Sequence, residues 1–443
     1  MLNLARMTAT GVGLAGIAGV WWRPATEPFL LPERLGKELV DAGAAFFALF
    51  DAVAGAYVHA PQVRALLGAR VPNAIPREMG AAPVLSLRPD FQLLADANGG
   101  YRLVATELEV CPSAHGVASA MQTGYGLAGD LVDAMCALLN GRRLRIVMAH
   151  AWSEFMWDQL AFCAALEAAG AQARLMFDIP IEQLCDEVAR GERWAPPMFG
   201  IPTRPLDWDT DVRARMRRHG FARLIDETAP NAGEVVFRFG YSDTFSRDRW
   251  RMFNGWQARG VTFLNPPTFV LDSKVVMALL HEPTVRARLQ PAEIATLERA
   301  LPETRPLDAS WAERIQAERE GWVLKFAGFD GGQQAWGGRS LQAGAAMSDA
   351  EWRAVVRRYL ELPFPCVAQR SAPSAEMSVN WVDGAERRAL RGRTRLRSFL
   401  IRIGSAGEVR ACGAHLTVAD SGLGVSESVT AVQAPVWFGK VET

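Results

Sequence analysis

The chain of 443 residues is electrically balanced, with 48 Lys plus Arg against 48 Asp plus Glu. A neutral chain offers no general electrostatic attraction to nucleic acid or to an anionic membrane. Its 49% apolar and 22% charged residues are typical of a globular protein that buries a real core. At roughly 100–200 residues per domain, we expect two or three domains or one large enzyme with several lobes.

The six cysteines are widely spaced and form no CxxC pair. A disulfide framework or a thiolate zinc site is therefore not expected, and reduced thiols in a cytoplasmic protein are the simplest interpretation. The apolar run 8–22 is short for a membrane span, rich in glycine and followed by no small-residue cleavage site. We assign it to the folded domain and expect no membrane association.

The first half of the chain predicts helices followed by strands. Residues 33–70 place apolar side chains at helical spacing, and residues 83–110 have the pattern of two strands. Residues 143–177 alternate strand, helix and strand, which is the βαβ pattern of a small parallel sheet. Two further strands are expected at 234–239 and 261–265.

The second half predicts a helical region to about residue 320 and then a mixed lobe. A helix at 348–360 separates the strands expected at 321–326, 365–369, 397–403 and 408–418. The fold class is therefore α/β or α+β. We divide the chain into residues 1–140, with helices and an acidic strand, 141–265, with the small parallel sheet, and 266–443, the mixed lobe.

The stretch "WVLKFAGFDGGQQAWGGRS", residues 322–340, carries the strongest chemical signal. A strand holds Lys325, and the following loop holds Asp330 among four glycines, so that backbone N–H groups can approach phosphate oxygens. Asp330 is a candidate ligand for Mg²⁺, which prefers carboxylate and phosphate oxygens. The spacing is not that of a Walker A loop. The alternative is a glycine-rich hairpin beside one exposed lysine.

Lys274 lies in the first turn of a helix predicted to begin near Asp272 or Ser273. A cation is mildly unfavourable there because the helix dipole is positive at its N-terminus. That misfit is expected of an anion-binding lysine. The alternative is a solvated side chain.

Glu107 and Glu109 are two apart on a predicted strand, and their side chains therefore share one face. Adjacent carboxylates repel unless a cation lies between them or one is protonated. A divalent ion that binds a nucleotide would relieve this repulsion. The alternative is an exposed strand face.

Taken in order, these stretches resemble the ATP-grasp superfamily, specifically its circularly permuted branch with eukaryotic glutathione synthetase and the synthetase domain of glutathionylspermidine synthetase. The resemblance covers roughly residues 103–116 and 234–443. It implies two α+β lobes around ATP and a small parallel-sheet domain for substrate, so that 266–443 would be the nucleotide-binding lobe.

By this resemblance, Mg²⁺ would be held by Glu107, Glu109 and Asp330. The family has a Glu-x-Asn pair where this chain has two glutamates, and a shifted pair of Glu109 with Cys111 would place a thiol on a hard ion. ATP would be bound by residues of three stretches: Lys274; Lys325, Gly331, Gly332 and Gln333; and Ala368 and Gln369, which would meet the adenine.

The resemblance also implies which residues contact the substrate. "FRFGY" corresponds to a substrate-contacting stretch, which gives Arg238 and Tyr241 that role, and we add Ser113 and His115, which follow the acidic strand. An arginine on an apolar strand is expensive to bury unless it binds a carboxylate. The arginine that the family uses near its C-terminus is missing, and Arg397 or Arg410 could replace it.

The implied activity is an ATP- and Mg²⁺-dependent ligase that joins a small carboxylate to an amine, with Arg238 and Lys325 as catalytic residues. Its expected partners are these small molecules, with no nucleic acid and no membrane, and a homodimer is the default assembly. The alternatives are a non-catalytic nucleotide-binding or scaffold protein, an ATP-grasp kinase of small molecules, and an α/β protein of another class.

Overall fold

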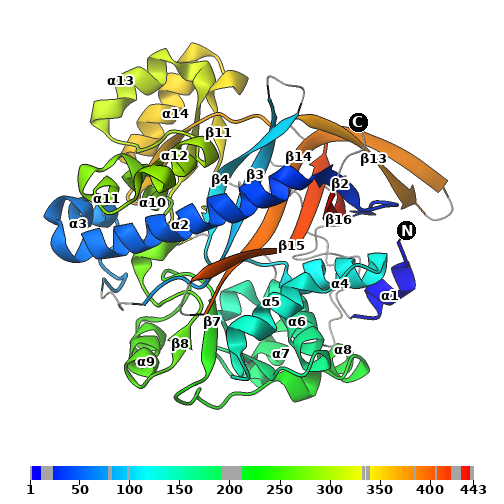
Figure 1. The fold of residues 1–443 in the computed structure, drawn as a ribbon. Coiled ribbons are helices and arrows are strands. Elements are labelled where there is room, and N and C mark those ends of the chain that lie inside the picture. The colour runs from blue at the N-terminus through cyan, green and yellow to red at the C-terminus, as the bar shows by residue number, and fades with distance from the viewer. Residues whose placement is uncertain are drawn as a thin grey trace.

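The protein is described from a computed structural model, which covers residues 2–10, 23–77, 82–96, 100–190, 212–331, 335, 340–383, 386–404, 407–420 and 431–439. Its described strands form three sheets, one of eight strands and two of four. Figure 1 shows the large sheet in the centre, the small parallel sheet below it and a separate lobe above it. The predicted mixed α/β class is confirmed.

The large sheet combines strands from both ends of the chain. Its main path is β1-β16-β15-β14-β3-β4, with β13 paired to β14 and β2 to β16. The strands from the first part of the chain are β1 (Arg23–Pro24), β2 (Phe29–Pro32), β3 (Ser86–Ala95) and β4 (Tyr101–Glu109). Those from the last part are β13 (Glu376–Asp383), β14 (Glu386–Ile403), β15 (Glu408–Ala419) and β16 (Val432–Gly439).

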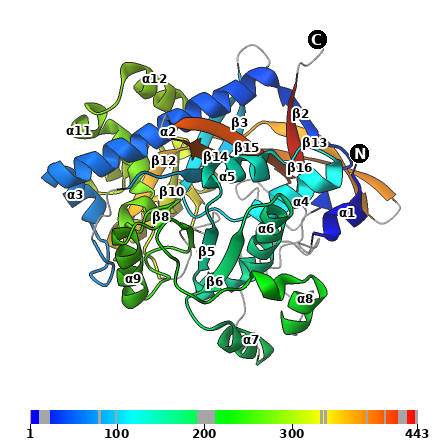
Figure 2. The same ribbon diagram turned by 60° about the horizontal axis from the view of Figure 1, so that its bottom comes forward.

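Helix α2 (Glu33–His59) crosses one face of this sheet (Figures 1 and 2). Its apolar side chains pack on the apolar face of the strands, as in the contact between the rings of Phe46 and Phe91. By length and composition α2 could span a membrane, but 61% of its most apolar stretch is buried inside the protein. The opposite face carries charged side chains and also apolar ones, as in the contact between Arg88 and the ring of Phe399.

The small parallel sheet has the order β6-β5-β7-β8. Its strands are β5 (Leu144–Met148), β6 (Ala173–Phe177), β7 (Val235–Phe239) and β8 (Thr262–Phe263), all parallel to their neighbours. Helix α6 (Met156–Ala168) joins the first two strands, as the βαβ pattern predicts. The other helices that pack around this region are α1 (Leu4–Thr8), α4 (His115–Tyr125), α5 (Asp130–Leu139), α7 (Ile181–Ala189), α8 (Val212–Arg218) and α9 (Arg247–Ala258).

The third sheet, β11-β10-β12-β9, belongs to a unit that we call the small lobe, residues 304–370. Its elements are β9 (Thr304–Pro306), α13 (Ala309–Ala317), β10 (Trp322–Phe326), β11 (Gln342–Ala343), α14 (Asp349–Glu361) and β12 (Cys366–Arg370). The small lobe has its own hydrophobic core, in which Trp352 and Tyr359 of α14 pack on Trp322 and Leu324 of β10. Between the body and this lobe lie α3 (Pro61–Gly68), α10 (Val275–Ala278), α11 (Pro283–Arg286) and α12 (Pro291–Ala300).

The strands of residues 266–443 belong to two different sheets, and the predicted domain division stays a prediction. Only residues 304–370 form the small lobe, whereas β13 to β16 complete the large sheet with β3 and β4. The physical reason is hydrogen bonding, because each of these strands finds its partner in a distant part of the chain. Most of the apolar run 8–22 lies outside the described residues.

Candidate functional site

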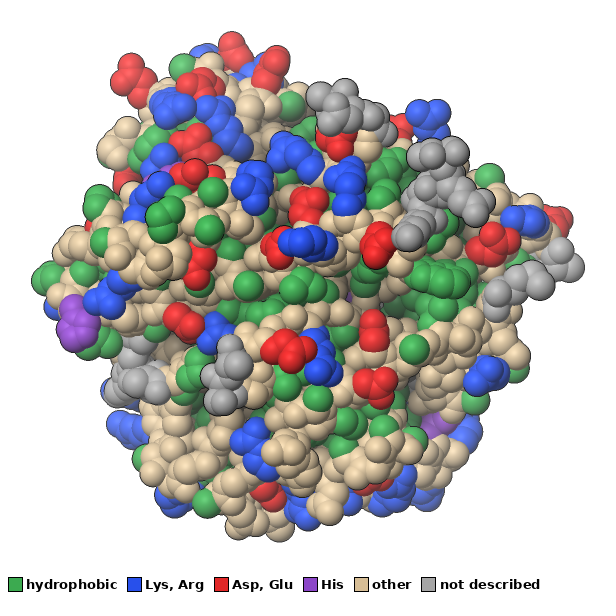
Figure 3. All heavy atoms as spheres, viewed as in Figure 1, with side chains coloured by type: hydrophobic (Ala, Val, Ile, Leu, Met, Phe, Trp, Pro, Cys, Tyr) green, Lys and Arg blue, Asp and Glu red, His purple; other side chains and the backbone are tan. Residues whose placement is uncertain are grey.

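The polar face of the large sheet collects charged side chains that are almost entirely buried. Arg88 and Asp90 of β3, Glu107 of β4, and Arg395 and Arg397 of β14 are each less than a tenth exposed. Burying charges is costly unless they are paired, and a sheet face built this way marks a candidate site. On the outside, by contrast, acidic and basic side chains are interspersed over the lobe of α13 and α14 (Figure 3).

Glu107 and Glu109 lie on this polar face and share it, as the period of two predicts. In the register of the strands, Glu107 is opposite Asp90 and Glu109 is opposite Arg88, with an irregularity beside Thr106. The Glu109 carboxylate accepts a 2.7 Å hydrogen bond from the hydroxyl of Tyr241. Burial and, second, the charge of Glu107 raise the pKa of Glu109 to about 7. The alternative of an exposed strand face is therefore wrong.

Lys274 is the residue just before α10, which follows a short 3-10 helix at Phe269–Asp272. Its ammonium lies 2.7 Å from the carboxylate of Glu107 and also donates to the carbonyl of Ala335. Lys274 is only 8% exposed, which excludes the solvated side chain. The structure thus brings the first predicted nucleotide lysine to the acidic strand.

Lys325 comes to the same strand from β10 of the small lobe. Its ammonium donates to the carbonyl of Thr106 at 3.1 Å and to Oε1 of Gln369 at 2.9 Å. Burial lowers the pKa of Lys325 to about 8, because the charged form loses its hydration. Lys325 is also only 8% exposed, so the alternative of an exposed hairpin lysine is wrong.

Gln369 and Ala368 are neighbours on β12, but only Gln369 reaches this site. The Gln369 amide also donates to Thr304 at 3.1 Å and lies 4.0 Å from the sulfur of Met277. Ala368 is fully buried in the middle strand of the small lobe, opposite Leu324 on one side and Arg305 on the other. Its backbone serves the sheet, which contradicts the predicted contact of Ala368 with adenine.

Asp330 accepts a 3.3 Å hydrogen bond from the N–H group of Ala335, the residue whose carbonyl accepts from Lys274. Asp330 is close to Asp243, whose pKa is raised to about 7 by burial and by the charges of Asp272 and Asp330. The Gly331 amide donates to Asp243 at 3.4 Å. Within the described ranges, no three His, Cys, Asp or Glu side chains form a group that could hold a metal ion. The predicted metal set of Glu107, Glu109 and Asp330 is therefore not assembled, and the predicted loop residues Gly332 and Gln333 lie outside the described residues.

Arg238 is fully buried on β7 and binds a carboxylate of the protein itself. Its guanidinium lies 2.9 Å from Asp272 and also donates to the carbonyl of Gly240. The cost of burying Arg238, which suggested a substrate carboxylate, is thus met by an internal ion pair. This corrects the prediction that Arg238 is a catalytic and substrate-binding residue. Tyr241, three residues on, does reach the site through Glu109.

His115 is a core residue and not a substrate contact. Its ring packs against Phe162, Phe237 and Phe399 at centroid distances of 4.9, 5.1 and 4.3 Å. Burial and the nearby charge of Arg88 lower the pKa of His115 to about 3, so the ring stays neutral. This corrects its predicted substrate contact, because a side chain that is 1% exposed and enclosed by rings cannot meet a ligand.

Ser113 belongs to the loop between β4 and α4. Its carbonyl accepts a 2.6 Å hydrogen bond from Arg88. Buried Asp158 of α6 fixes this loop by accepting the N–H groups of Ala114 at 2.8 Å and Val117 at 2.9 Å. Ala114 has a left-handed backbone with φ of 74°, which these bonds stabilise. The predicted substrate contact of Ser113 stays a prediction, and what the structure adds is its backbone contact with Arg88.

Sequence reasoning missed a cluster of three arginines around Asp90. Arg397 approaches this carboxylate at 3.1 Å, Arg395 at 3.3 Å and Arg88 at 3.5 Å. Burial alone would raise the pKa of Asp90, and the three guanidiniums hold it well below its usual range. The alternating arginines of "RTRLR" were the available signal, because residues two apart on a strand share a face. Arg410, the other candidate replacement, is 45% exposed and paired with Glu408.

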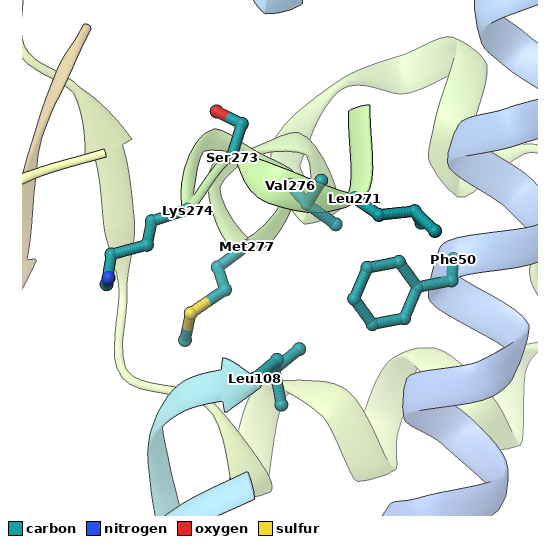
Figure 4. A pocket seen from close by; sticks show the side chains of 7 residues that line it. All are labelled: Phe50, Leu108, Leu271, Ser273, Lys274, Val276 and Met277. Carbon is teal, nitrogen blue, oxygen red and sulfur yellow. The ribbon is translucent and has the colours of Figure 1, made fainter. Parts of the chain in front are cut away.

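A small pocket adjoins Lys274 on the side of α2 (Figure 4). Met277 of α10 points toward Leu108 of β4, and the Lys274 ammonium lies at the edge of this group of side chains. The lining is mostly apolar and comprises Phe50, Leu108, Leu271, Ser273, Lys274, Val276 and Met277.

The large sheet with its charged face, the parallel sheet and the small lobe together form a mixed α/β fold that this chain shares with a solved structure. Among solved structures, the chain is similar to a glutathione synthetase-like effector from Globodera pallida. The TM-score is 0.51 at 12% identity, and the likeness covers 99% of this chain and 97% of the effector.

Fainter likenesses carry no functional argument. One is to a candidate gamma-glutamylcysteine synthetase from Methylobacillus flagellatus, with a TM-score of 0.37, 10% identity and coverage of 86% of this chain and 84% of that protein. Another is to an O-methyltransferase from Streptomyces achromogenes, with a TM-score of 0.19, 10% identity and coverage of 59% and 91%. No protein-family model and no curated protein match the sequence.

Proposed function

We propose that the protein is an ATP- and Mg²⁺-dependent ligase that joins the carboxylate of a small amino-acid or peptide-like molecule to an amine. The fold supports the general class of synthetase. The observation that carries the proposal is the convergence of Lys274 and Lys325 on one acidic strand from two different parts of the molecule. Two buried ammonium groups that meet at one place suit a polyphosphate.

The two glutamates fit Mg²⁺ as part of a nucleotide complex. Mg²⁺ usually takes one or two protein carboxylates and completes its shell with phosphate oxygens and water, so a third protein ligand is not required. The raised pKa of Glu109 beside Glu107 reflects a repulsion that a cation would relieve. When bound, the ion would neutralise phosphate charge, and Glu107 and Glu109 are the residues that would hold it.

The proposed reaction has two steps. An oxygen of the substrate carboxylate forms a bond to the γ-phosphorus of ATP, and ADP leaves. The amine then forms a C–N bond to the acyl carbon, phosphate leaves, and the amine gives up a proton. Lys274 and Lys325 would stabilise the phosphate charge in both steps, and the lobe would keep water from the acylphosphate.

The arginine cluster is the proposed anchor for the carboxylate substrate. Arg88, Arg395 and Arg397 surround a single carboxylate, Asp90, on the same sheet face as Glu107. An excess of positive charge in a buried place attracts an anion. We therefore expect Arg397→Met to weaken carboxylate binding about 10- to 150-fold, the value of one charged hydrogen bond. Arg410→Met, which removes an exposed arginine of the next strand, is the matched control.

Several finer features stay predictions that accompany the proposal. They are the circularly permuted branch of the family, the phosphate contacts of Gly331, Gly332 and Gln333, a cytoplasmic location, a homodimer, and the absence of nucleic-acid and membrane partners. The predicted division into domains 1–140, 141–265 and 266–443 stays a prediction in the same sense.

The test is calorimetric titration of the full chain with ATP, with Mg²⁺ and with excess EDTA. We expect Mg²⁺-dependent binding that weakens about 10- to 150-fold in Lys325→Met, since one charged hydrogen bond is lost. Arg410→Met should bind like the wild type. Folded wild-type protein that binds no ATP would refute the proposal. Screening carboxylates and amines for ADP release and amide product follows a positive result.

A non-catalytic nucleotide-binding or scaffold protein on the same fold is the second candidate. It is favoured by one observation, the pairing of Lys274 with Glu107, which closes the site with internal contacts. ATP binding without ADP release from any carboxylate and amine pair would support it. A phosphorylated carboxylate or alcohol, formed without amide, would instead identify a small-molecule kinase.

A further inference from the structure

The small lobe contacts the body of the protein at several places among the described residues, including the packing of α10 on β9 and β12, and two of these places involve cationic side chains. One is the candidate site, where Lys325 of β10 donates to Thr106 of β4. The other involves α3, which lies at the far end of α2 on the same side of the molecule as α13 and α14 (Figure 1). Because the small lobe has its own core, its orientation depends on such contacts between the two units.

Arg70, which follows α3, makes the second attachment. One guanidinium nitrogen donates to three carbonyls at the end of α14, those of Tyr359 at 3.2 Å, Leu360 at 3.1 Å and Leu362 at 3.4 Å. The other donates to the carbonyl of Leu307, just after β9. A single side chain of the body thus holds two elements of the small lobe.

The end of α14 needs a donor from outside its own chain segment. The last four carbonyls of a helix have no partner within it, and they carry the negative end of the helix dipole. Pro363 follows immediately and has no N–H group to donate. The positive guanidinium of Arg70 therefore donates to the carbonyls at the end of α14. In many helices these carbonyls accept hydrogen bonds from the backbone that follows.

The backbone of Arg70 adopts a left-handed conformation with φ of 57°. Residues other than glycine are rarely found there, and they persist only where surrounding contacts fix them. The four carbonyl acceptors of the side chain are contacts of that kind. Arg70 directly follows the C-cap of α3, a position where helices commonly end in this conformation, so its side-chain contacts add to a local turn.

We propose that Arg70 is a positioning residue that sets the orientation of the small lobe and thereby places Lys325 over the acidic strand. The inference rests on the proposed function, in which Lys325 binds the phosphates of ATP. The planar fork of arginine can reach several carbonyls at once, whereas the ammonium of lysine is a compact point charge. Lysine at position 70 should therefore restore the charge but only part of the positioning.

Arg64 offers a matched control. It lies on α3 itself and donates to the carbonyls of Tyr57 at 3.0 Å and Val58 at 2.8 Å, at the end of α2. It therefore also supports a helix end, but one within the body. Arg64→Ala removes a comparable interaction without freeing the small lobe.

The experiment compares Arg70→Ala, Arg70→Lys and Arg64→Ala in the full chain. Titration with ATP and Mg²⁺ should show a loss of affinity of up to about a hundredfold in Arg70→Ala, since misplacement by about 1 Å has effects of that size. The ATP affinity of Arg70→Lys should lie between those of the wild type and Arg70→Ala. Arg64→Ala should bind ATP like the wild type. Hydrogen exchange should accelerate across the small lobe in Arg70→Ala, and in Arg64→Ala only at the end of α2.

Wild-type ATP affinity in Arg70→Ala, or an equal loss in Arg64→Ala, would overturn the positioning role. If the wild type itself binds no ATP, the proposed function fails, and hydrogen exchange alone decides about the attachment. Faster exchange in β10 as well as in α14 would then support Arg70 as the link between the units. Unchanged exchange in β10 would refute it.

Discussion

Lys325 shows how burial, together with neighbouring charges, gives a residue a pH-dependent role. Its pKa is lowered to about 8, so the free protein carries an ammonium below that pH and a neutral amine above it. Since the proposed phosphate contact needs the charge, we expect ATP affinity to fall about tenfold between pH 7 and pH 9. The measurement is calorimetric titration over this range.

Lys325→Arg provides the control for this pH dependence, because an arginine stays charged throughout and the ionisation of ATP itself is unchanged. The variant should bind with nearly constant affinity from pH 7 to pH 9. A wild-type affinity that is equally constant would show that Lys325 does not supply the charge.

The buried pair of Arg238 and Asp272 makes a prediction about stability. Removing one partner leaves the other charge buried and unpaired, so Arg238→Met should lower the free energy of unfolding by about 3–5 kcal/mol. In the double variant Arg238→Met/Asp272→Leu, the loss should be smaller than in Arg238→Met alone. The measurement is urea unfolding of the wild type and of these two variants.

The exposed pair of Arg286 and Glu298, 2.8 Å apart, is the comparison for this ion pair. Solvent screens such a pair, and Arg286→Met should change the free energy of unfolding by about 1 kcal/mol at most. Similar losses at Arg238 and Arg286 would contradict the account of Arg238 as a buried structural ion.

At the scale of elements, the close packing of α4 on α6 depends on Gly116. A Cβ added there would lie 2.1 Å from the backbone oxygen of Asp158, which cannot move away like a flexible side chain. Gly116→Ala should therefore destabilise the protein by about 1–3 kcal/mol, although alanine favours helices. Thermal and urea unfolding are the measurements.

Gly55 of α2 is the matched glycine for this test. A Cβ there meets only the end of the Arg288 side chain, at 2.9 Å, and that side chain can shift. Gly55→Ala should be neutral or stabilise by up to about 1 kcal/mol through helix propensity. If both glycines tolerate alanine equally, the packing of α4 on α6 is looser than described.

At the scale of the whole molecule, β16 joins the two ends of the chain, because it pairs with β15 on one side and with β1 and β2 on the other. Ala434 of this strand is fully buried, so Ala434→Asp would bury an unpaired charge. We expect a loss of about 3 kcal/mol or more, or failure to fold. Trp437→Asp, at a side chain that is 61% exposed, should change stability by about 0.5 kcal/mol or little more. Urea unfolding distinguishes a strand that is integral to the fold from one that is an appendage.

Patterns of short range were readable from the sequence. The helical spacing of 33–70 predicted α2 and α3, and the strand–helix–strand pattern of 143–177 predicted parallel β5 and β6. The period of two placed Glu107 and Glu109 on one face, and the dipole misfit drew attention to Lys274. The predictions of elements and faces succeeded because periodicity acts over a few residues, whereas the anion-binding role of Lys274 stays a prediction.

What only the tertiary structure decided is which distant groups meet. The sequence showed that a buried Arg238 requires a carboxylate, but not that Asp272 provides it. Asp90 lies about three hundred positions from Arg397 and meets it only because β3 pairs with β14. His115 and Asp330 were placed at the site by their neighbours in sequence, whereas packing put one in the core and the other beside Asp243. Sequence by itself thus determined the elements and the kinds of charge they carry. The pairing of strands from both chain ends determined which charges share the buried face, because burial and partners depend on contacts that no local pattern encodes.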